Sequence, residues 1–210
     1  MSEPRPPKRE RTRAKLIAAG FQVLAERGDA LTASDVVAEA DVANGTFYNH
    51  FLDRDDFIET LARESLKAIT VDSAEQTEGA DPAWRFAVAS TRVLEAAVHQ
   101  PLWARAVLRL AERPSPPHAT VQRHLRNDLA TGLSAGRFSH GDDPVTVDLV
   151  TGTLISALRR ITADVETVDD RTIPAVVTRL LEAIGIDRAE AASLADSAGR
   201  KRRASTSDPT

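Results

Sequence analysis

LTASDVVAEADVANGTFYNHF, residues 31–51, is the stretch from which the fold of this chain can be predicted. Apolar residues at helical spacing predict a first short helix over about 33–40 and a second over about 44–50. Asp41 and Val42 lie between them and leave room only for a tight turn. Two short helices joined by such a turn form a helix-turn-helix.

Both helices have start and packing signals. Thr32 and Asp35 have the spacing of a capping box, in which each side chain accepts a hydrogen bond from the other residue's backbone N–H. Phe47 and Phe51 are four residues apart, so both rings lie on one side of the second helix. We therefore expect this helix to pack through its two rings, with the opposite side turned outward.

The outward side of the second helix is small and polar and carries no acidic residue. Such a helix can enter a DNA major groove without repulsion from the phosphates. Asn44, Thr46 and Asn49 are candidates for contacts with base edges, because an asparagine amide can make a bidentate contact with adenine. Gly45 has no side chain and lets the backbone approach the DNA closely.

The run VANGTFYNHF, residues 42–51, followed by DRDDF, residues 53–57, resembles the signature of the tetracycline repressor (TetR) family. Two positions depart from the family pattern: Asp41 stands where the turn usually has Gly, and Ala43 stands where a Ser cap is common. Asp is among the few residues that tolerate a left-handed backbone. The positions that match are Thr46, Phe47, Tyr48, His50, Phe51, Arg54 and Phe57.

The resemblance implies a DNA-binding transcriptional regulator, with repression as its usual mode. Thr32, Tyr48, His50 and Arg54 resemble positions that contact DNA phosphates in the family. The alternative for Tyr48 is a half-buried aromatic residue with its hydroxyl in water, and for His50 a residue that caps the helix end. The DNA site that we expect comprises Thr32, Ala43, Asn44, Gly45, Thr46, Tyr48, Asn49, His50 and Arg54.

The composition limits the class of protein. The chain has 210 residues, of which 42% are hydrophobic, enough for one or two small domains with a real core. It has no cysteine, which excludes disulfides and thiolate metal sites and favours a reducing cytoplasm. No apolar run approaches the ~18 residues that a membrane helix needs, and the first residues form no apolar signal segment.

The spacing of prolines, glycines and apolar residues predicts an all-α fold of about nine helices. Residues 1–8 are expected to form a basic, disordered leader, which either stays solvated or contacts DNA beside the main site. A three-helix DNA-binding domain is expected over 9–54, and a helical effector-binding and dimerisation domain over 55–186. Residues 187–210 are expected to form a disordered tail. An auxiliary DNA contact through the basic run 200–203 is the alternative to a merely solvated tail.

The two helices expected over 144–166 and 171–185 each carry an apolar stripe. Such stripes indicate either a homodimer interface built as a four-helix bundle or the ordinary core of one chain. The residues predicted for the dimer interface are Leu154, Leu158, Val177, Leu181 and Ile184. The other helices are expected over 9–27, 54–74, 82–99, 101–112 and 117–135, and prolines fall at or near several of these starts.

The effector is less well defined by the sequence. Five of the nine aromatic residues fall in or beside the helix-turn-helix, so a pocket in the larger domain would be mostly aliphatic. This favours a lipophilic small molecule, although a purely structural role in the core is the alternative for both tryptophans. The residues predicted to line the pocket are Trp84, Trp103, Arg105 and His124.

No motif indicates catalysis or a cofactor. The chain has no HExxH sequence, no glycine-rich phosphate loop and no nucleophile elbow, and the spacing of His118 and His124 fits no common metal site. Two alternatives compete with an operator-binding homodimer. One is a helical sensor or enzyme whose helix-turn-helix does not bind DNA. The other is an adaptor that binds only proteins.

Overall fold

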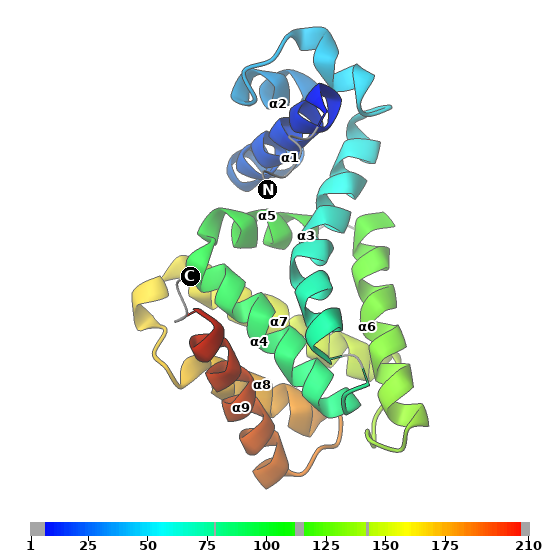
Figure 1. The fold of residues 1–210 in the computed structure, drawn as a ribbon, viewed down its shortest axis with the longest axis vertical. Coiled ribbons are helices and arrows are strands. Elements are labelled where there is room, and N and C mark those ends of the chain that lie inside the picture. The colour runs from blue at the N-terminus through cyan, green and yellow to red at the C-terminus, as the bar shows by residue number, and fades with distance from the viewer. Residues whose placement is uncertain (1–6, 78, 112–115, 142, 207–210) are drawn as a thin grey trace, which may run out of the picture.

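The computed structural model describes residues 7–77, 79–111, 116–141 and 143–206, and all its regular elements there are helices (Figure 1). The all-α prediction is therefore confirmed. Residues 1–6 of the expected leader lie outside the described residues, and Lys8 already begins a helix. The α-helices are α1 (Lys8–Arg27), α2 (Ala33–Glu39), α3 (Arg54–Thr77), α4 (Pro82–His99), α5 (Pro101–Ala111), α6 (Pro116–Ser134), α7 (Pro144–Ala163), α8 (Thr172–Ala183) and α9 (Arg188–Thr206), with 3₁₀-helices η1 (Gly28–Ala30), η2 (Asn44–Asn49) and η3 (Val165–Thr167).

The N-terminal part has its own hydrophobic core, which we call the reader core. It contains residues from α1, α2, η2 and the first half of α3. Its largest fully buried side chains are Leu16, Leu24, Leu31, Phe47, Phe57 and Leu61. Gly20 makes this packing possible, because a Cβ there would collide with Cζ of the Phe57 ring. The first helix thus supports the helix-turn-helix from behind.

The second helix of the motif differs from the prediction in its type. Residues 44–49 form a 3₁₀-helix and not an α-helix. Ala43 at the N-cap has no side-chain oxygen to accept a hydrogen bond from the first turn, and helices of this length often take the tighter 3₁₀ form. The turn before it has Asp41 at φ 51°, the left-handed conformation that the family's usual Gly would adopt.

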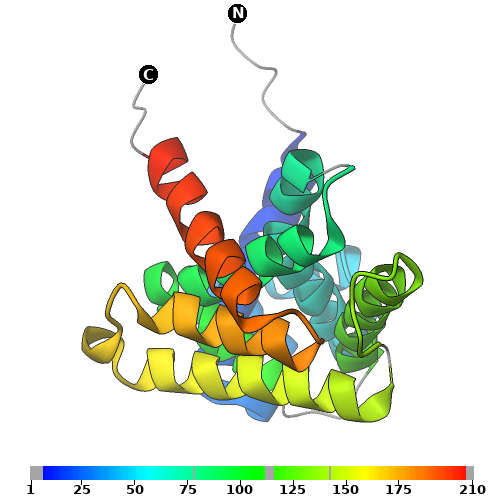
Figure 2. The same ribbon diagram turned by 90° about the horizontal axis from the view of Figure 1, so that it is seen from below.

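The larger C-terminal part is organised around α4, which contacts α3, α5, α6, α7, α8 and α9. Its buried residues form a second core, which we call the C-terminal core, including Leu94, Trp103, Leu129, Ile161 and Leu180. Figure 2 shows α7 and α8 side by side at one edge of the molecule, with α9 crossing over α8. No helix among the described residues is long and apolar enough to cross a membrane.

α5 lies between the two cores. Its residues Ala106 and Leu110 are buried in the reader core, whereas Trp103 and Leu108 are buried in the C-terminal core. Phe21 of α1 packs against both cores. α5 therefore joins the C-terminal core to α1, which supports the helix-turn-helix.

The expectation of a disordered tail over 187–210 is wrong for residues 188–206, which form a helix, and residues 207–210 lie outside the described residues. α9 spans Arg188–Thr206 and packs against α8 and α4. Three alanines at helical spacing, Ala191, Ala195 and Ala198, are buried, because their small side chains let the helix lie close to its neighbours. Asp187 caps the helix by accepting a hydrogen bond from the backbone N–H of Ala189 at 2.8 Å.

Candidate nucleic-acid interface

An aromatic cluster holds η2 in place. Phe47, Phe51 and Phe57 are buried, and their ring centroids are 5.4 Å (Phe47–Phe51), 5.0 Å (Phe47–Phe57) and 4.7 Å (Phe51–Phe57) apart. The rings meet edge-on or tilted, which are favourable geometries for aromatic pairs. The opposite side of η2 is thereby fixed toward solvent.

The outward side of η2 has the composition that the sequence predicted. Ala43, Asn44, Gly45, Tyr48 and Asn49 are exposed, and Thr46 is half-buried. The Tyr48 side chain is 66% exposed, while its ring packs edge-on against Phe47 with the centroids 5.3 Å apart. The ring is therefore held in position and its hydroxyl can reach an external group.

Gly45 lies in open space. A Cβ at this position would have no atom within 4 Å, so nothing inside the described chain requires a glycine there. In a short helix that presents its backbone to solvent, a glycine permits another molecule to approach the main chain. This agrees with a surface that approaches DNA closely.

Thr32 is committed to the capping box at the start of α2. Its hydroxyl donates to a carboxylate oxygen of Asp35 at 2.7 Å and accepts from the Asp35 backbone N–H at 3.2 Å. Arg27 binds the other oxygen of Asp35 at 2.8 Å. The Thr32 hydroxyl and, more weakly, Arg27 hold the pKa of Asp35 below its usual range. The capping box that the sequence predicted is confirmed.

Arg54 has a structural role that sequence reasoning missed. Its Nε donates a hydrogen bond to the carbonyl oxygen of Leu31 at 2.9 Å, and its NH1 lies 3.4 Å from a carboxylate oxygen of Asp55. Since Leu31 closely precedes α2, Arg54 joins the start of α3 to the start of the helix-turn-helix. A phosphate contact by Arg54 would have to be made alongside this hydrogen bond.

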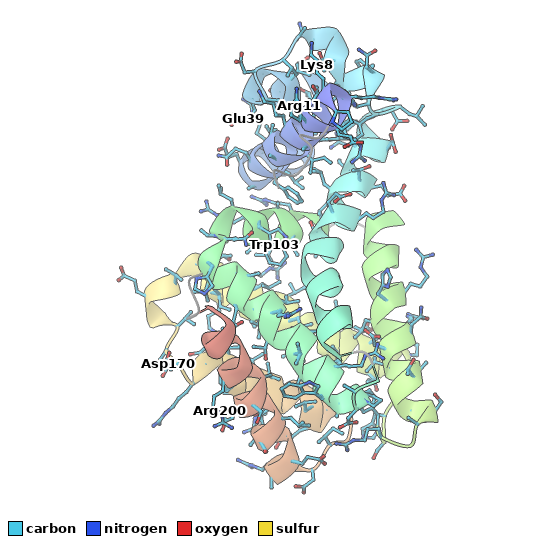
Figure 3. The ribbon with its side chains drawn as sticks, viewed as in Figure 1. Lys8, Arg11, Glu39, Trp103, Asp170 and Arg200 are labelled. Carbon is cyan, nitrogen blue, oxygen red and sulfur yellow. The ribbon has the colours of Figure 1, made fainter. Side chains whose placement is uncertain are left out.

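The first turns of α1 bring basic residues to the reader. The Arg13 guanidinium carbon lies 5.4 Å from the centroid of the Phe51 ring, a cation–π geometry. Burial, followed by the charges of Arg9 and Arg13, lowers the pKa of His50. Figure 3 shows Lys8 and Arg11 at the same end of α1, beside the helix-turn-helix. Arg9 and Arg13 are four residues apart in the sequence, and this spacing predicts that they lie on the same side of α1.

Two family signatures match the chain. The one described as "Bacterial regulatory proteins, tetR family" matches residues 16–61, and "Tetracyclin repressor-like, C-terminal domain" matches residues 81–197. The chain belongs to the tetracycline repressor family. As a TetR-family member it is a DNA-binding transcriptional regulator, and its helix-turn-helix is the DNA-binding element.

The TetR-family chain also resembles solved structures along most of its length. RolR in complex with resorcinol is 25% identical, with 90% of this chain and 94% of that chain covered and a TM-score of 0.56. A γ-butyrolactone receptor described as ArpA-like is 22% identical, with 92% and 100% covered and a TM-score of 0.63. FadR from Bacillus subtilis in complex with stearoyl-CoA is 18% identical, with 82% and 98% covered and a TM-score of 0.65. No curated protein matches the sequence.

The residues predicted to bind an effector separate into two pairs. Trp103 is buried in the C-terminal core of the TetR-family chain, and Trp84 is partly buried against the same core. Arg105 and His124 are exposed, on α5 and α6 respectively. The structure therefore places Trp103 in the interior, Trp84 at the edge of the core and the two basic residues on the surface.

The stripe predicted as a dimer interface is mostly the inner side of its helices. Leu158, Val177, Leu181 and Ile184 are at most 3% exposed and belong to the C-terminal core of one chain. The chain itself covers these four side chains, and their contact with a second chain stays a prediction. Leu154 is half-buried against the same core. Periodicity identified the apolar side of each helix but could not tell whether the chain itself covers it.

Proposed function

We propose that the chain is a repressor that binds a two-fold symmetric operator as a homodimer and releases it when a small molecule binds. The observation that carries this proposal is the exposed, acid-free side of η2, held by three buried phenylalanine rings. A side that is both rigid and unobstructed suits base readout, because its side chains need little ordering when DNA binds.

The DNA contacts divide into reading and positioning. Asn44, Thr46 and Asn49 would read base edges, with each well-aligned asparagine contributing about 1–3 kcal/mol of discrimination. Ala43 and Gly45 would let the backbone come near the groove. Tyr48 and the protonated form of His50 would bind phosphates, together with the basic end of α1. Thr32 and Arg54 support these contacts by fixing the starts of α2 and α3.

A homodimer is supported by the size of one reader. A single 3₁₀-helix of this length spans only a few base pairs, whereas two copies about 34–36 Å apart read a symmetric site over successive major grooves. α7 and α8 would supply the dimer contacts through their outer sides, which remain partly exposed in one chain. A repressor of this kind would act in the cytoplasm, where its operator DNA lies.

The proposed effector is a mainly apolar molecule with a hydrogen-bond acceptor. In the C-terminal part, Trp103 Nε1 and Thr91 Oγ1 are buried, and neither has a hydrogen-bond partner among the described residues. Buried polar atoms are nearly always paired, so both atoms are candidates to bind an effector. RolR was solved with resorcinol and FadR with stearoyl-CoA, which are both molecules with apolar parts and oxygen atoms.

Selection of random duplex DNA by the purified protein, beside the variant Tyr48→Ala, tests the DNA-binding half of the proposal. We expect an enriched palindrome with half-sites about one or two helical turns apart, lost in the variant. If the folded dimer enriches no sequence at low salt, the alternative of a small-molecule sensor with a silent helix-turn-helix is favoured. If only single half-sites are enriched, the dimeric arrangement is wrong.

The effector half is tested with resorcinol and stearoyl-CoA as probes. Each is titrated into the protein while tryptophan fluorescence is followed, and then into the complex with the selected DNA. We expect one of the probe classes to change the fluorescence of the wild type, to change that of Trp103→Phe less, and to release the DNA. A probe that binds without changing DNA affinity would contradict the proposed switch, because a ligand shifts an equilibrium only by its differential affinity.

A further inference from the structure

Leu52 has the most exposed large apolar side chain among the described residues, at 86%. It lies in the loop between η2 and α3, directly after the buried Phe51. Single apolar residues are common on protein surfaces, so exposure alone does not indicate a function. Leu52 differs because the loop that carries it is held in one shape and lies beside basic groups of the helix-turn-helix.

Hydrogen bonds fix the backbone of this loop. The Leu52 N–H donates to Asp56 Oδ2 at 2.9 Å, and the Asp56 N–H donates to Asp53 Oδ1 at 2.8 Å. Arg54 Nε donates to the carbonyl oxygen of Leu31, which joins the loop to the start of α2. The Leu52 side chain therefore projects into solvent from a backbone tied to both α2 and α3, and little ordering is needed when it meets a partner.

Positive charge gathers next to the loop. The Arg13 guanidinium carbon lies 5.4 Å from the centroid of the Phe51 ring. Burial, followed by the charges of Arg9 and Arg13, lowers the pKa of His50, so both arginines lie near that side chain. His50 and Phe51 immediately precede Leu52 in the chain. A DNA phosphate attracted to these basic groups would bring its neighbouring sugar close to Leu52.

The loop itself is not suited to bind phosphate by charge. Residues 53–56 carry three carboxylates and one guanidinium, and Arg54 NH1 lies 3.4 Å from a carboxylate oxygen of Asp55. A deoxyribose ring, which joins successive phosphates, presents apolar carbon atoms and no charge. Packing of a leucine against it removes apolar surface of both partners from water, which is favourable without any ion pair.

We propose that Leu52 is a DNA-positioning residue that packs against a deoxyribose of the operator, beside the phosphate bound by His50. This rests on the proposed operator binding through η2 and adds an apolar contact to it. Contacts with sugars fix the register and orientation of a protein on DNA and do not read the bases directly. Because the proposed homodimer presents Leu52 twice, each operator complex would contain two such contacts.

Affinity for the selected operator tests the contact in three variants. Leu52→Ala should bind about tenfold more weakly than the wild type, because apolar surface is lost from two contacts in each complex. The loss should be the same at low and high salt, since an apolar contact releases no counterions. Leu52→Met, of similar volume, should bind within about threefold of the wild type.

Leu133→Ala is the matched control. Leu133 is 43% exposed and lies at the end of α6 that is remote from the helix-turn-helix (Figure 1). The variant loses the same apolar atoms as Leu52→Ala and should bind the operator like the wild type. A loss as large as that of Leu52→Ala would mean that removal of any exposed leucine weakens binding, and would overturn the contact.

The outcomes separate the Leu52 contact from operator binding itself. If the wild type binds the operator and a folded Leu52→Ala binds it equally well, the contact is overturned and operator binding stands. If the wild type enriches no DNA, both are overturned. Deoxyuridine in place of each operator thymine identifies the surface that Leu52 touches. A Leu52→Ala loss that disappears on one such operator would assign Leu52 to a thymine methyl group and overturn the sugar contact. A loss that persists on all of them is the expected result.

Discussion

At the scale of single residues, two glycines show how the same residue type serves different ends. Gly20 is required because Phe57 fills the space that its side chain would occupy. At Gly199 of α9, an added Cβ would have no atom within 4 Å, and the backbone φ is not positive. Sequence alone cannot distinguish these cases, because both glycines lie inside helices of the structure and only the neighbouring helix decides what each can accept.

Gly20→Ala should lower the free energy of unfolding by about 1–3 kcal/mol, because the added methyl group overpacks the reader core. Gly199→Ala is the matched control and should raise the free energy of unfolding by about 0.4–1 kcal/mol, because alanine lowers the conformational entropy of the unfolded chain. Denaturant titration of both variants measures the difference. Equal effects of the two substitutions would mean that Gly20 does not contact Phe57.

His50 should make DNA binding depend on pH. Burial, followed by the charges of Arg9 and Arg13, lowers the pKa of His50 in the free protein, so the protonated form is less favoured than in an ordinary histidine. Phosphates favour its protonated form, and binding therefore takes up a proton. We expect affinity for the selected DNA to rise as pH falls from about 7.5 to 6, and His50→Gln to flatten that dependence. A wild type and variant with the same pH profile would exclude His50 from the phosphate contacts.

At the scale of elements, proline positions predicted helix starts well. Pro82, Pro101 and Pro144 each begin a helix in the structure, because a proline fits a first turn and cannot continue a previous helix. The end of the chain was not predicted, since a run rich in Ala, Ser and Arg contains only one large apolar residue, Leu194. α9 is held partly by a contact far away in sequence, which no local pattern contains.

Arg137 makes this long-range contact with α9. It joins Asp81, which caps α4, to Glu190 in the first turn of α9, with Arg137 Nε 2.8 Å from Asp81 Oδ1. The two carboxylates raise the pKa of Arg137 further above its usual value, Asp81 having the larger effect. These groups are partly exposed, so their contribution to folding is modest despite the good geometry.

Arg137→Gln should lower the free energy of unfolding by about 1 kcal/mol and speed hydrogen exchange in α9. Arg179→Gln is the control, because Arg179 is 62% exposed and pairs with Glu182 within α8. Denaturant titration with exchange mass spectrometry follows both. If exchange in α9 is unchanged in Arg137→Gln, the buried alanines alone hold the helix.

At the scale of the whole molecule, the chain joins a reader to a helical domain through a helix shared by two cores. The side chains of α5 pack into both cores, and α5 therefore joins them. The family resemblance, carried by a short run of sequence, predicted both a DNA-binding domain and an effector-binding domain. It did not predict the outer side of α7, because exposure within one chain becomes known only when the helices are assembled.

Dimerisation should account for much of the operator affinity. Leu149→Asp introduces a charge on the outer side of α7, which we propose as part of the dimer contact, and should give a monomer that folds normally, because Leu149 is 49% exposed in one chain. Its affinity for a full palindrome should fall by about 100-fold or more, while its affinity for an isolated half-site stays unchanged. A loss at the half-site too would indicate damage to the reader and not to the dimer.

The most direct test of the central claim is a base-by-base affinity profile of the selected operator. It is measured for the wild type, Asn44→Ala, Asn49→Ala and the phosphate-site variant Arg11→Gln. We predict that each asparagine variant loses preference at one base position, repeated symmetrically in both half-sites. Arg11→Gln should weaken all sequences alike and reduce the salt dependence. Unchanged base preferences in both asparagine variants would contradict the claim that the outward side of η2 reads the operator.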